Sequence, residues 1–417
     1  TTMRLPLLFS TLFLSASASA SAGLDLDALR EAARARDLPR LAQLSEASSG
    51  EPLEMYPRYY WLNAQLSQIS ESDASGFLNR YDNTPLADRF RNEWIKELAR
   101  RQSWPAFESE YLRISQPNSE LQCFKAQAEL ARNERSNLNA NKALWFSGKP
   151  LASACNPIFD ALFASGTLSN NDAWWRIRQA FAGNRADFAR QLASRVGNPS
   201  ELSAKNVAAA SNAPEKYLSK ASGDSRAARE VQLYALELVG RKNPDQAARL
   251  IAEMEEQLSA TDQRFAWQQL GLTAARRHHP SASVWLSKAD MSDLEEEDQA
   301  WFLRAALRAS DWSAVEARIK ALPKERQDDK TYRYWLARSL EAQSRTLEAR
   351  PIYLSLSEDF GYYGQLSREK LGSIIETPRA PYKTSSEEIK QIGEMAGVKR
   401  ALLLNSQGWR VEGNREW

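Results

Sequence analysis

The sequence predicts an all-α protein built as a superhelix of stacked helical hairpins, and three observations lead to this fold class. Strong helix formers dominate the chain, and no run alternates apolar and polar residues as a strand would. Apolar residues recur at helical spacing in paired segments joined by short polar turns. Finally, Trp267, Trp301 and Trp335 lie 34 residues apart, twice in succession, which indicates a structural repeat.

The first segment, residues 1–22, has the pattern of a secretory signal peptide. Arg4 supplies a positive charge, Leu5–Leu14 is a short apolar stretch, and the small residues Ala20-Ser21-Ala22 precede Gly23. The apolar stretch is shorter than the roughly 20 residues that a membrane-spanning helix needs. We therefore expect residues 23–417 to form an exported, periplasmic protein with no membrane span.

Composition excludes some function classes. The 417 residues include 55 Lys and Arg against 53 Asp and Glu, so the formal net charge is +2. This balance gives no electrostatic basis for nucleic-acid binding.

The helical hairpins are clearest in the second half of the chain. The apolar stripes are Phe302, Ala305, Ala306 and Ala309, then Trp312, Val315 and Ile319, then Tyr332, Trp335, Leu336 and Leu340, then Ala349, Ile352, Tyr353 and Leu356. An earlier pair of segments starts at Trp174 and Ala186. In the stripe from Ala349 to Leu356, Pro351 predicts either a helix start or a kink, because proline cannot donate the helical hydrogen bond.

The repeat has a physical interpretation. About 34 residues is the length of one tetratricopeptide-type hairpin, which must stack on neighbours to bury its apolar face. Each repeating Trp is followed about two turns later by a small residue, Ala274 or Ala275, Ala309, and Ala342. We expect these small residues to let neighbouring helices approach closely. We also expect the aromatic residues to be core, with one member of Trp174-Trp175 and of Tyr362-Tyr363 exposed.

Little in the chain has the pattern of a catalytic or metal site. His278 and His279 are the only histidines; they are adjacent, and we expect them in a surface turn. The acidic run Glu295–Asp298 is typical of a solvated helix start. We therefore predict no catalytic, cofactor-binding or metal-binding residues in this sequence.

The two cysteines, Cys123 and Cys155, suit a disulfide in an oxidising compartment. The alternative is two buried free thiols. Their spacing fits neither a redox motif nor a zinc cluster.

Several segments resemble soluble lytic murein transglycosylases. Tyr332–Ala342 (YRYWLARSLEA) followed by Tyr353 and Gly361–Gly364 (GYYG) is similar to the closing helices of that family's ring-forming domain. Cys123, Ala143–Lys149 (ALWFSGK) and Cys155 resemble its disulfide-bearing segment. Asn405–Trp417 resembles the linker domain that follows.

The resemblance implies a right-handed α-superhelix bent into a ring or horseshoe over residues 23–376, and a short helical linker domain over residues 377–417. It also implies a lysozyme-like catalytic domain, which cleaves the bond between N-acetylmuramic acid and N-acetylglucosamine without water and leaves a 1,6-anhydro sugar. A single Glu in a Glu-Ser-x-aromatic motif serves that domain, with a Gly-Leu-Met-Gln-like segment downstream. This sequence contains no Gly-Leu-Met-Gln, and Glu108-Ser109-Glu110-Tyr111 lies inside the superhelical region, so we expect Glu108 to be a chance match.

We therefore expect the non-catalytic superhelical portion of such an enzyme, inactive as written, that guides or binds peptidoglycan glycan strands. Other cell-wall enzymes are further candidate partners, and no cofactor is implied. The alternatives are a periplasmic helical-repeat adaptor that binds a protein partner and, ranked far below both, an independent enzyme that uses Glu108.

Overall fold

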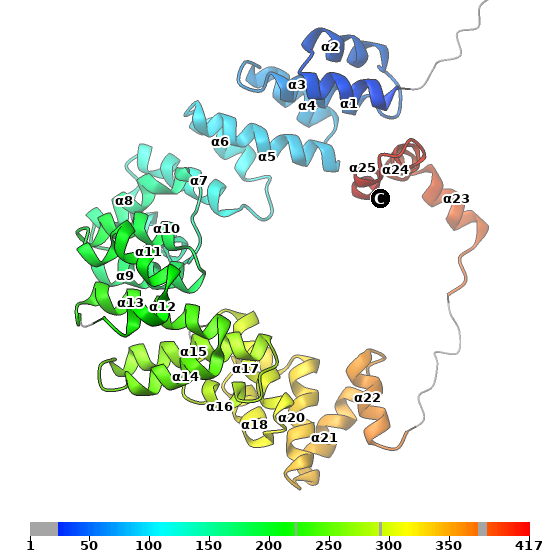
Figure 1. The fold of residues 1–417 in the computed structure, drawn as a ribbon. Helices are drawn as coiled ribbons and strands as arrows, with labels where there is room; N and C mark the ends of the chain where they lie inside the picture. The colour runs from blue at the N-terminus through cyan, green and yellow to red at the C-terminus, as the bar shows by residue number, and fades with distance from the viewer. Residues whose placement is uncertain (1–23, 222, 292–293, 374–381) are drawn as a thin grey trace, which may run out of the picture. The chain divides into compact units, whose positions relative to one another are not determined.

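The structure is a computed structural model that describes residues 24–221, 223–291, 294–373 and 382–417. Every regular element in these ranges is a helix, which confirms the all-α prediction (Figure 1). None of the described helices combines the length and the apolar character that a bilayer crossing requires. The predicted signal peptide and the predicted domain boundary at residue 377 lie outside the described residues.

The described residues divide into two compact units, one of which is discontinuous in sequence. Unit 1 joins the residues up to Asn133 to the segment Tyr382–Trp417. Its helices are α1 (Leu26–Ala35), α2 (Leu38–Ala47), α3 (Met55–Ala64), α4 (Glu71–Arg80), α5 (Pro85–Arg100), α6 (Trp104–Tyr111), α7 (Ser119–Ala131), α23 (Ser386–Glu394), α24 (Ala396–Ser406) and α25 (Arg410–Glu416).

Unit 2 covers the described residues between Glu134 and Pro381. It begins with irregular 3₁₀ segments and short helices: η1 (Arg135–Trp145), η2 (Ser153–Cys155), α8 (Asn156–Ala164), α9 (Asn170–Ala182), α10 (Ala186–Gln191), η3 (Leu192–Val196), η4 (Ser200–Leu202), α11 (Ala204–Asn212) and α12 (Pro214–Leu218). Regular hairpins follow: α13 (Arg226–Lys242), α14 (Pro244–Glu253), α15 (Ala260–Arg276), α16 (Ala282–Leu286), α17 (Glu296–Arg308), α18 (Trp312–Lys320), α19 (Lys324–Gln327), α20 (Lys330–Ala342), α21 (Thr346–Ser357) and α22 (Tyr362–Lys370).

Local sequence explains where many helices begin. At the α17–α18 turn, Ser310 has φ +53° and Asp311 accepts a hydrogen bond from the Ala314 N–H at 3.0 Å. This contact satisfies one of the free N–H groups at the start of α18. Ser169 starts α9 with a capping box that includes Asp172. The hairpin turns are therefore encoded locally.

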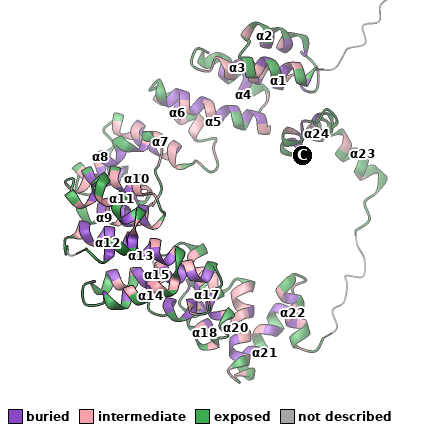
Figure 2. Cartoon of the chain, in the orientation of Figure 1, coloured by how far each residue is buried: buried purple, intermediate pink, exposed green. Residues whose placement is uncertain are grey.

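The hairpins of unit 2 stack side by side. The first helix of one hairpin packs on the first helix of the next, α13 on α15 and α15 on α17, while each also packs on its own partner. Buried residues follow the faces between helices, and exposed residues follow the outer faces (Figure 2). This is the arrangement of a helical-repeat stack, in which each hairpin needs its neighbours to bury its apolar surface.

Helix α20 shows how one helix serves two neighbours. Tyr334, Ala337 and Leu340 belong to a core shared with α21. Trp335 and Leu336 also pack against the core of the preceding hairpin, α17–α18. The predicted stripe on this helix was therefore incomplete, because a helix inside a stack buries two faces rather than one.

The small residues proposed for close approach are only partly confirmed. Ala274 and Ala275 are buried, but Ala309 and Ala342 are exposed at the ends of their helices, so this part of the prediction was wrong. Gly271 makes a close approach instead, because an added Cβ there would lie 2.5 Å from Leu286 of the partner helix.

Two smaller predictions are also resolved. Tyr362 is exposed and Tyr363 is half-buried, while Trp174 is buried and Trp175 is half-buried against Phe146. Helix α21 starts at Thr346 and continues through Pro351, so the proline does not mark its start.

Candidate functional site

Glu108 lacks the environment of a general acid. Its carboxylate lies 2.7 Å from the Arg132 guanidinium and 3.2 Å from the Lys125 ammonium. Burial raises the pKa of Glu108, but the hydrogen bonds from Arg132 and Lys125 outweigh burial and hold the pKa below its ordinary value. A carboxyl that is ionised well below neutral pH has no proton to give at pH 7. The chance match to the family motif is thus a structural ion cluster between α6 and α7.

The two histidines lie in the turn after α15, as predicted. His278 is exposed with φ +61°. The His279 ring stacks on Trp285 with centroids 4.9 Å apart, and its Nε2 lies 3.6 Å from Asp245. No group of three potential metal ligands occurs among the described residues.

The acidic run behaves as a helix start. Helix α17 begins at Glu296, so Glu296, Glu297 and Asp298 occupy its first turn, where the helix dipole favours negative charge. Asp298 also pairs with Arg276 of the preceding hairpin.

Cys123 and Cys155 are fully buried, and both are disulfide-bonded. The free-thiol alternative does not describe the structure.

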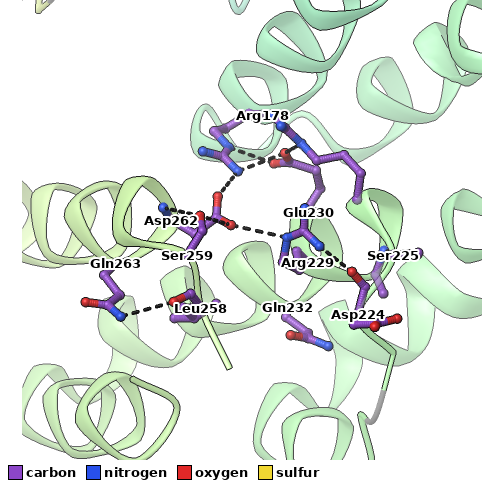
Figure 3. A network of polar contacts seen from close by, with 12 residues as sticks. Arg178, Asp224, Ser225, Arg229, Glu230, Gln232, Leu258, Ser259, Asp262 and Gln263 are labelled. Carbon is purple, nitrogen blue, oxygen red and sulfur yellow. Dashed lines mark hydrogen bonds and ion pairs between the residues drawn. The ribbon is translucent and has the colours of Figure 1, made fainter. Parts of the chain in front are cut away.

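Unit 2 contains a buried ion network that was not predicted from the sequence (Figure 3). Arg178 of α9 makes a bidentate contact with Glu230 of α13, at 2.8 and 2.9 Å, and a second contact with Asp262 of α15. Arg229 Nε lies 3.2 Å from Asp262, and Arg226 Nε lies 2.6 Å from Glu230.

These ion pairs connect three helices that are far apart in sequence. Arg178, Glu230 and Asp262 are each less than 10% exposed. Burial alone would lower the pKa of Arg178, but Glu230 and Asp262 raise it above its ordinary value. Burial raises the pKa of Asp262, and hydrogen bonds from Ser259 and Arg178 reverse that effect and lower it. Because an unpaired buried charge is costly, the network favours one register between α9, α13 and α15.

A second cluster of ion pairs and hydrogen bonds, around Glu316, joins the last hairpins. Glu316 of α18 accepts hydrogen bonds from Lys320 at 2.5 Å, from Gln343 at 2.9 Å and from Arg345 at 2.7 Å. Hydrogen bonds from Lys320 and Arg345 lower the pKa of Glu316 to about 2. Arg345 precedes α21, so this carboxylate ties α18 to the following hairpin.

Unit 1 contains a contact between segments that are far apart in the sequence, which we call the clasp: Tyr56, Arg400 and Glu416. The Tyr56 hydroxyl of α3 donates to Glu416 of α25 at 3.1 Å. Arg400 Nε of α24 donates to the other oxygen of the same carboxylate at 2.8 Å. The Glu416 side chain is only 1% exposed, so the clasp is shielded from water.

Trp409 reinforces the clasp. Its ring is buried and makes edge contacts with Tyr56 and Tyr60 at centroid distances of 6.0 and 6.2 Å. The Arg30 guanidinium lies 4.9 Å from the same ring. Trp409 and Leu404 thus belong to the hydrophobic core of the first seven helices, α1 to α7. The C-terminal helices are part of unit 1 because of these contacts.

No family model matches this chain. It is similar to curated proteins named soluble lytic murein transglycosylase. The Escherichia coli K12 protein is 23% identical over 386 residues, which cover 89% of this chain and 58% of that protein. The Salmonella typhimurium protein is 24% identical over the same span. This chain therefore spans less than two thirds of the length of these relatives.

Solved structures give the same result for the fold. An inactive mutant of the lytic transglycosylase Slt from Pseudomonas aeruginosa matches 93% of this chain and 65% of its own, with 24% identity and a TM-score of 0.64. The 70-kDa soluble lytic transglycosylase from Escherichia coli matches 94% of this chain and 64% of its own, with 20% identity and a TM-score of 0.55. The resemblance drawn from the sequence is thus confirmed: this chain is a homologue of the soluble lytic murein transglycosylases and shares the helical superhelix fold of their solved structures.

Proposed function

We propose that this chain is the non-catalytic superhelical portion of a periplasmic soluble lytic transglycosylase, and that it guides or binds peptidoglycan glycan strands. The observation that carries the proposal is the similarity to enzymes named for murein, which extends along 89% of the chain. The proposal includes the Cys123–Cys155 pairing and the export signal that residues 1–22 predict. It also includes the ring shape that the resemblance implies.

The chemistry of Glu108 supports the proposed lack of activity in this portion. Its one match to the catalytic motif, Glu108, is an ionised partner of Arg132 and Lys125. Cleavage without water needs one group that gives a proton to the leaving oxygen and then takes one back. A carboxylate whose ionised form is stabilised on two sides is unsuited to the first step.

The C-terminal helices supply a surface for a further protein partner or domain. We call it the C-terminal apolar face, and it consists of large apolar side chains that are 48–62% exposed: Ile389, Ile392, Met395, Leu402 and Val411. Helix α23 has no buried residue in the described chain. Large apolar side chains left exposed on neighbouring helices suit a protein contact surface. We propose that this face holds the remaining part of the longer enzyme.

The same face favours the second candidate, a periplasmic adaptor that binds a separate protein. The two candidates differ in what the rest of the chain binds. A transglycosylase portion binds purified peptidoglycan sacculi, whereas an adaptor does not.

The test combines sedimentation with sacculi and product analysis. We expect the 417-residue protein to co-sediment with sacculi and to release no 1,6-anhydro products. The variant Ile389→Asp with Ile392→Asp should bind sacculi normally and lose binding to the C-terminal part of a relative supplied in trans. If the protein fails to co-sediment, the adaptor becomes the better account.

A further inference from the structure

A cavity of about 340 Å³ lies in unit 1 beside the clasp, between α3, α5 and α25. This volume falls at the lower end of the range of small-molecule sites. Its apolar lining comes from Pro85 and Leu86 at the start of α5. Its polar lining comes from Tyr56, Arg89, Asn92, Glu93, Glu412 and Arg415.

Three charged side chains in this lining are not paired with other polar groups of the described residues. Within the described parts of the chain, Arg89, Glu412 and Arg415 have neither an ion pair nor a hydrogen bond through their side chains. This sets them apart from most charged residues in the structure, including the neighbouring Glu416, which has two partners. Guanidinium groups favour paired, bidentate contacts with carboxylates, so two uncommitted arginines at one cavity are notable.

The three charged side chains act on the same group of tyrosines in α3, Tyr56, Tyr59 and Tyr60. Arg89 and Arg415 both act on the pKa of Tyr59 and of Tyr60, and Glu412 acts on the pKa of Tyr56 and of Tyr60. The Arg89 guanidinium also lies 5.4 Å from the Tyr59 ring. Since α5 carries Arg89 and α25 carries Arg415 and Glu412, a ligand that meets all three groups would bridge the two helices.

The charge balance of the lining restricts the ligand. Two arginines oppose a purely cationic ligand, and Glu93 and Glu412 oppose a purely anionic one. A ligand with a carboxylate and an ammonium group satisfies both signs. The apolar lining of Pro85 and Leu86 suits a small aliphatic side chain between the carboxylate and the ammonium group of the ligand. A short peptide has all three features.

We propose that this cavity binds a short zwitterionic peptide, such as the peptide portion of peptidoglycan, with its carboxylate at Arg89 and Arg415 and its ammonium group at Glu412. The choice of peptidoglycan as the source rests on the proposed function. Because the ligand touches both α5 and α25, its binding stabilises the clasp and raises the unfolding temperature.

The test titrates the full 417-residue protein with the tripeptide L-Ala-γ-D-Glu-L-Lys by calorimetry and by thermal unfolding. We expect saturable binding and a higher unfolding midpoint. Arg415→Gln and Glu412→Gln should each weaken binding about tenfold, because each removes a charge-assisted contact. Arg410→Gln is the matched control: it is an exposed residue of the same helix outside the cavity, and it should leave binding unchanged.

Chemical variants of the peptide sharpen the test. Acetylation of both amines, or amidation of both carboxyl groups, should abolish binding, and unchanged binding of either form would overturn the proposal. Equal binding of the all-L, α-linked tripeptide would overturn the assignment to peptidoglycan.

Failure of this inference is distinguishable from failure of the proposed function. If the protein co-sediments with sacculi but binds no tripeptide at millimolar concentration, the cavity assignment is wrong and the proposed function stands. Circular dichroism of each variant excludes misfolding as the cause of lost binding, since Arg415 is exposed and Glu412 is half-exposed.

Discussion

The hydroxyl of Tyr56 donates a hydrogen bond to Glu416 at 3.1 Å, although 360 positions separate the two residues in the sequence. Arg400 holds the other oxygen of the same carboxylate, and Trp409 packs against the Tyr56 ring. These contacts make the last helices part of the same core as the first seven helices. Four predictions about stability follow from this and from the other buried contacts.

Removal of the clasp hydroxyl should destabilise unit 1. In Tyr56→Phe, the buried carboxylate of Glu416 loses one donor and keeps Arg400, so we expect a loss of about 1–2 kcal/mol in the free energy of unfolding. Urea denaturation measures this loss. Amide hydrogen exchange in α25 should accelerate with it. Tyr362→Phe, at a residue that is 71% exposed, is the control and should change neither quantity. An equal effect of both substitutions would show that the clasp contributes nothing.

Disruption of the buried network should cost more. Arg178→Met leaves Glu230 and Asp262 buried without their shared partner, which predicts a loss of about 3–5 kcal/mol. Arg308→Met, at an exposed position of α17, should change stability by less than about 0.5 kcal/mol. Denaturation of unit 2 by urea compares the two variants. If Arg178→Met were as stable as the unchanged protein, the network would not fix the stacking register.

Glu316 predicts a pH dependence with a defined sign. Its pKa falls from 4.5 to about 2 on folding, so the unfolded chain binds more protons in this range. The stabilisation is therefore complete above pH 5 and is lost as the pH falls toward 2. We expect Glu316→Gln to lose about 1–2 kcal/mol at pH 7, after allowance for solvent screening, and the difference from the unchanged protein to shrink below pH 4. A difference that is constant from pH 7 to pH 2 would contradict this ionisation model.

The disulfide should be detectable by mass and by stability. Alkylation under denaturing conditions without reductant should leave Cys123 and Cys155 unmodified, and reduction should make both reactive. The Cys123→Ser, Cys155→Ser double variant should lose about 3–4 kcal/mol in the chain-entropy model. Alkylation of either cysteine before reduction would exclude the proposed pairing.

The local parts of the fold could be predicted from the sequence, because helix caps and apolar stripes depend on residues only a few positions apart. Ser310 and Asp311 mark the α17–α18 turn in the sequence as well as in the structure. Counting along a stripe does not reveal where a helix ends, and for this reason Ala309 was wrongly assigned to the buried face.

The long-range contacts could not be predicted in the same way. A single sequence gives no signal that pairs Tyr56 with Glu416, or Arg178 with Glu230 and Asp262. Each of these residues taken alone is typical of a solvated helix surface. Only the stacking of helices removes the charges from water and brings opposite signs together.

Incubation of the purified protein with sacculi tests directly the proposal that this chain binds peptidoglycan without cleaving it. The sedimented fraction reports binding, and chromatography with mass spectrometry of the supernatant reports cleavage. We predict that the protein sediments with the sacculi and that no 1,6-anhydro muropeptides appear, both before and after Glu108→Gln. Anhydro products from the unchanged protein that disappear in Glu108→Gln would contradict the account.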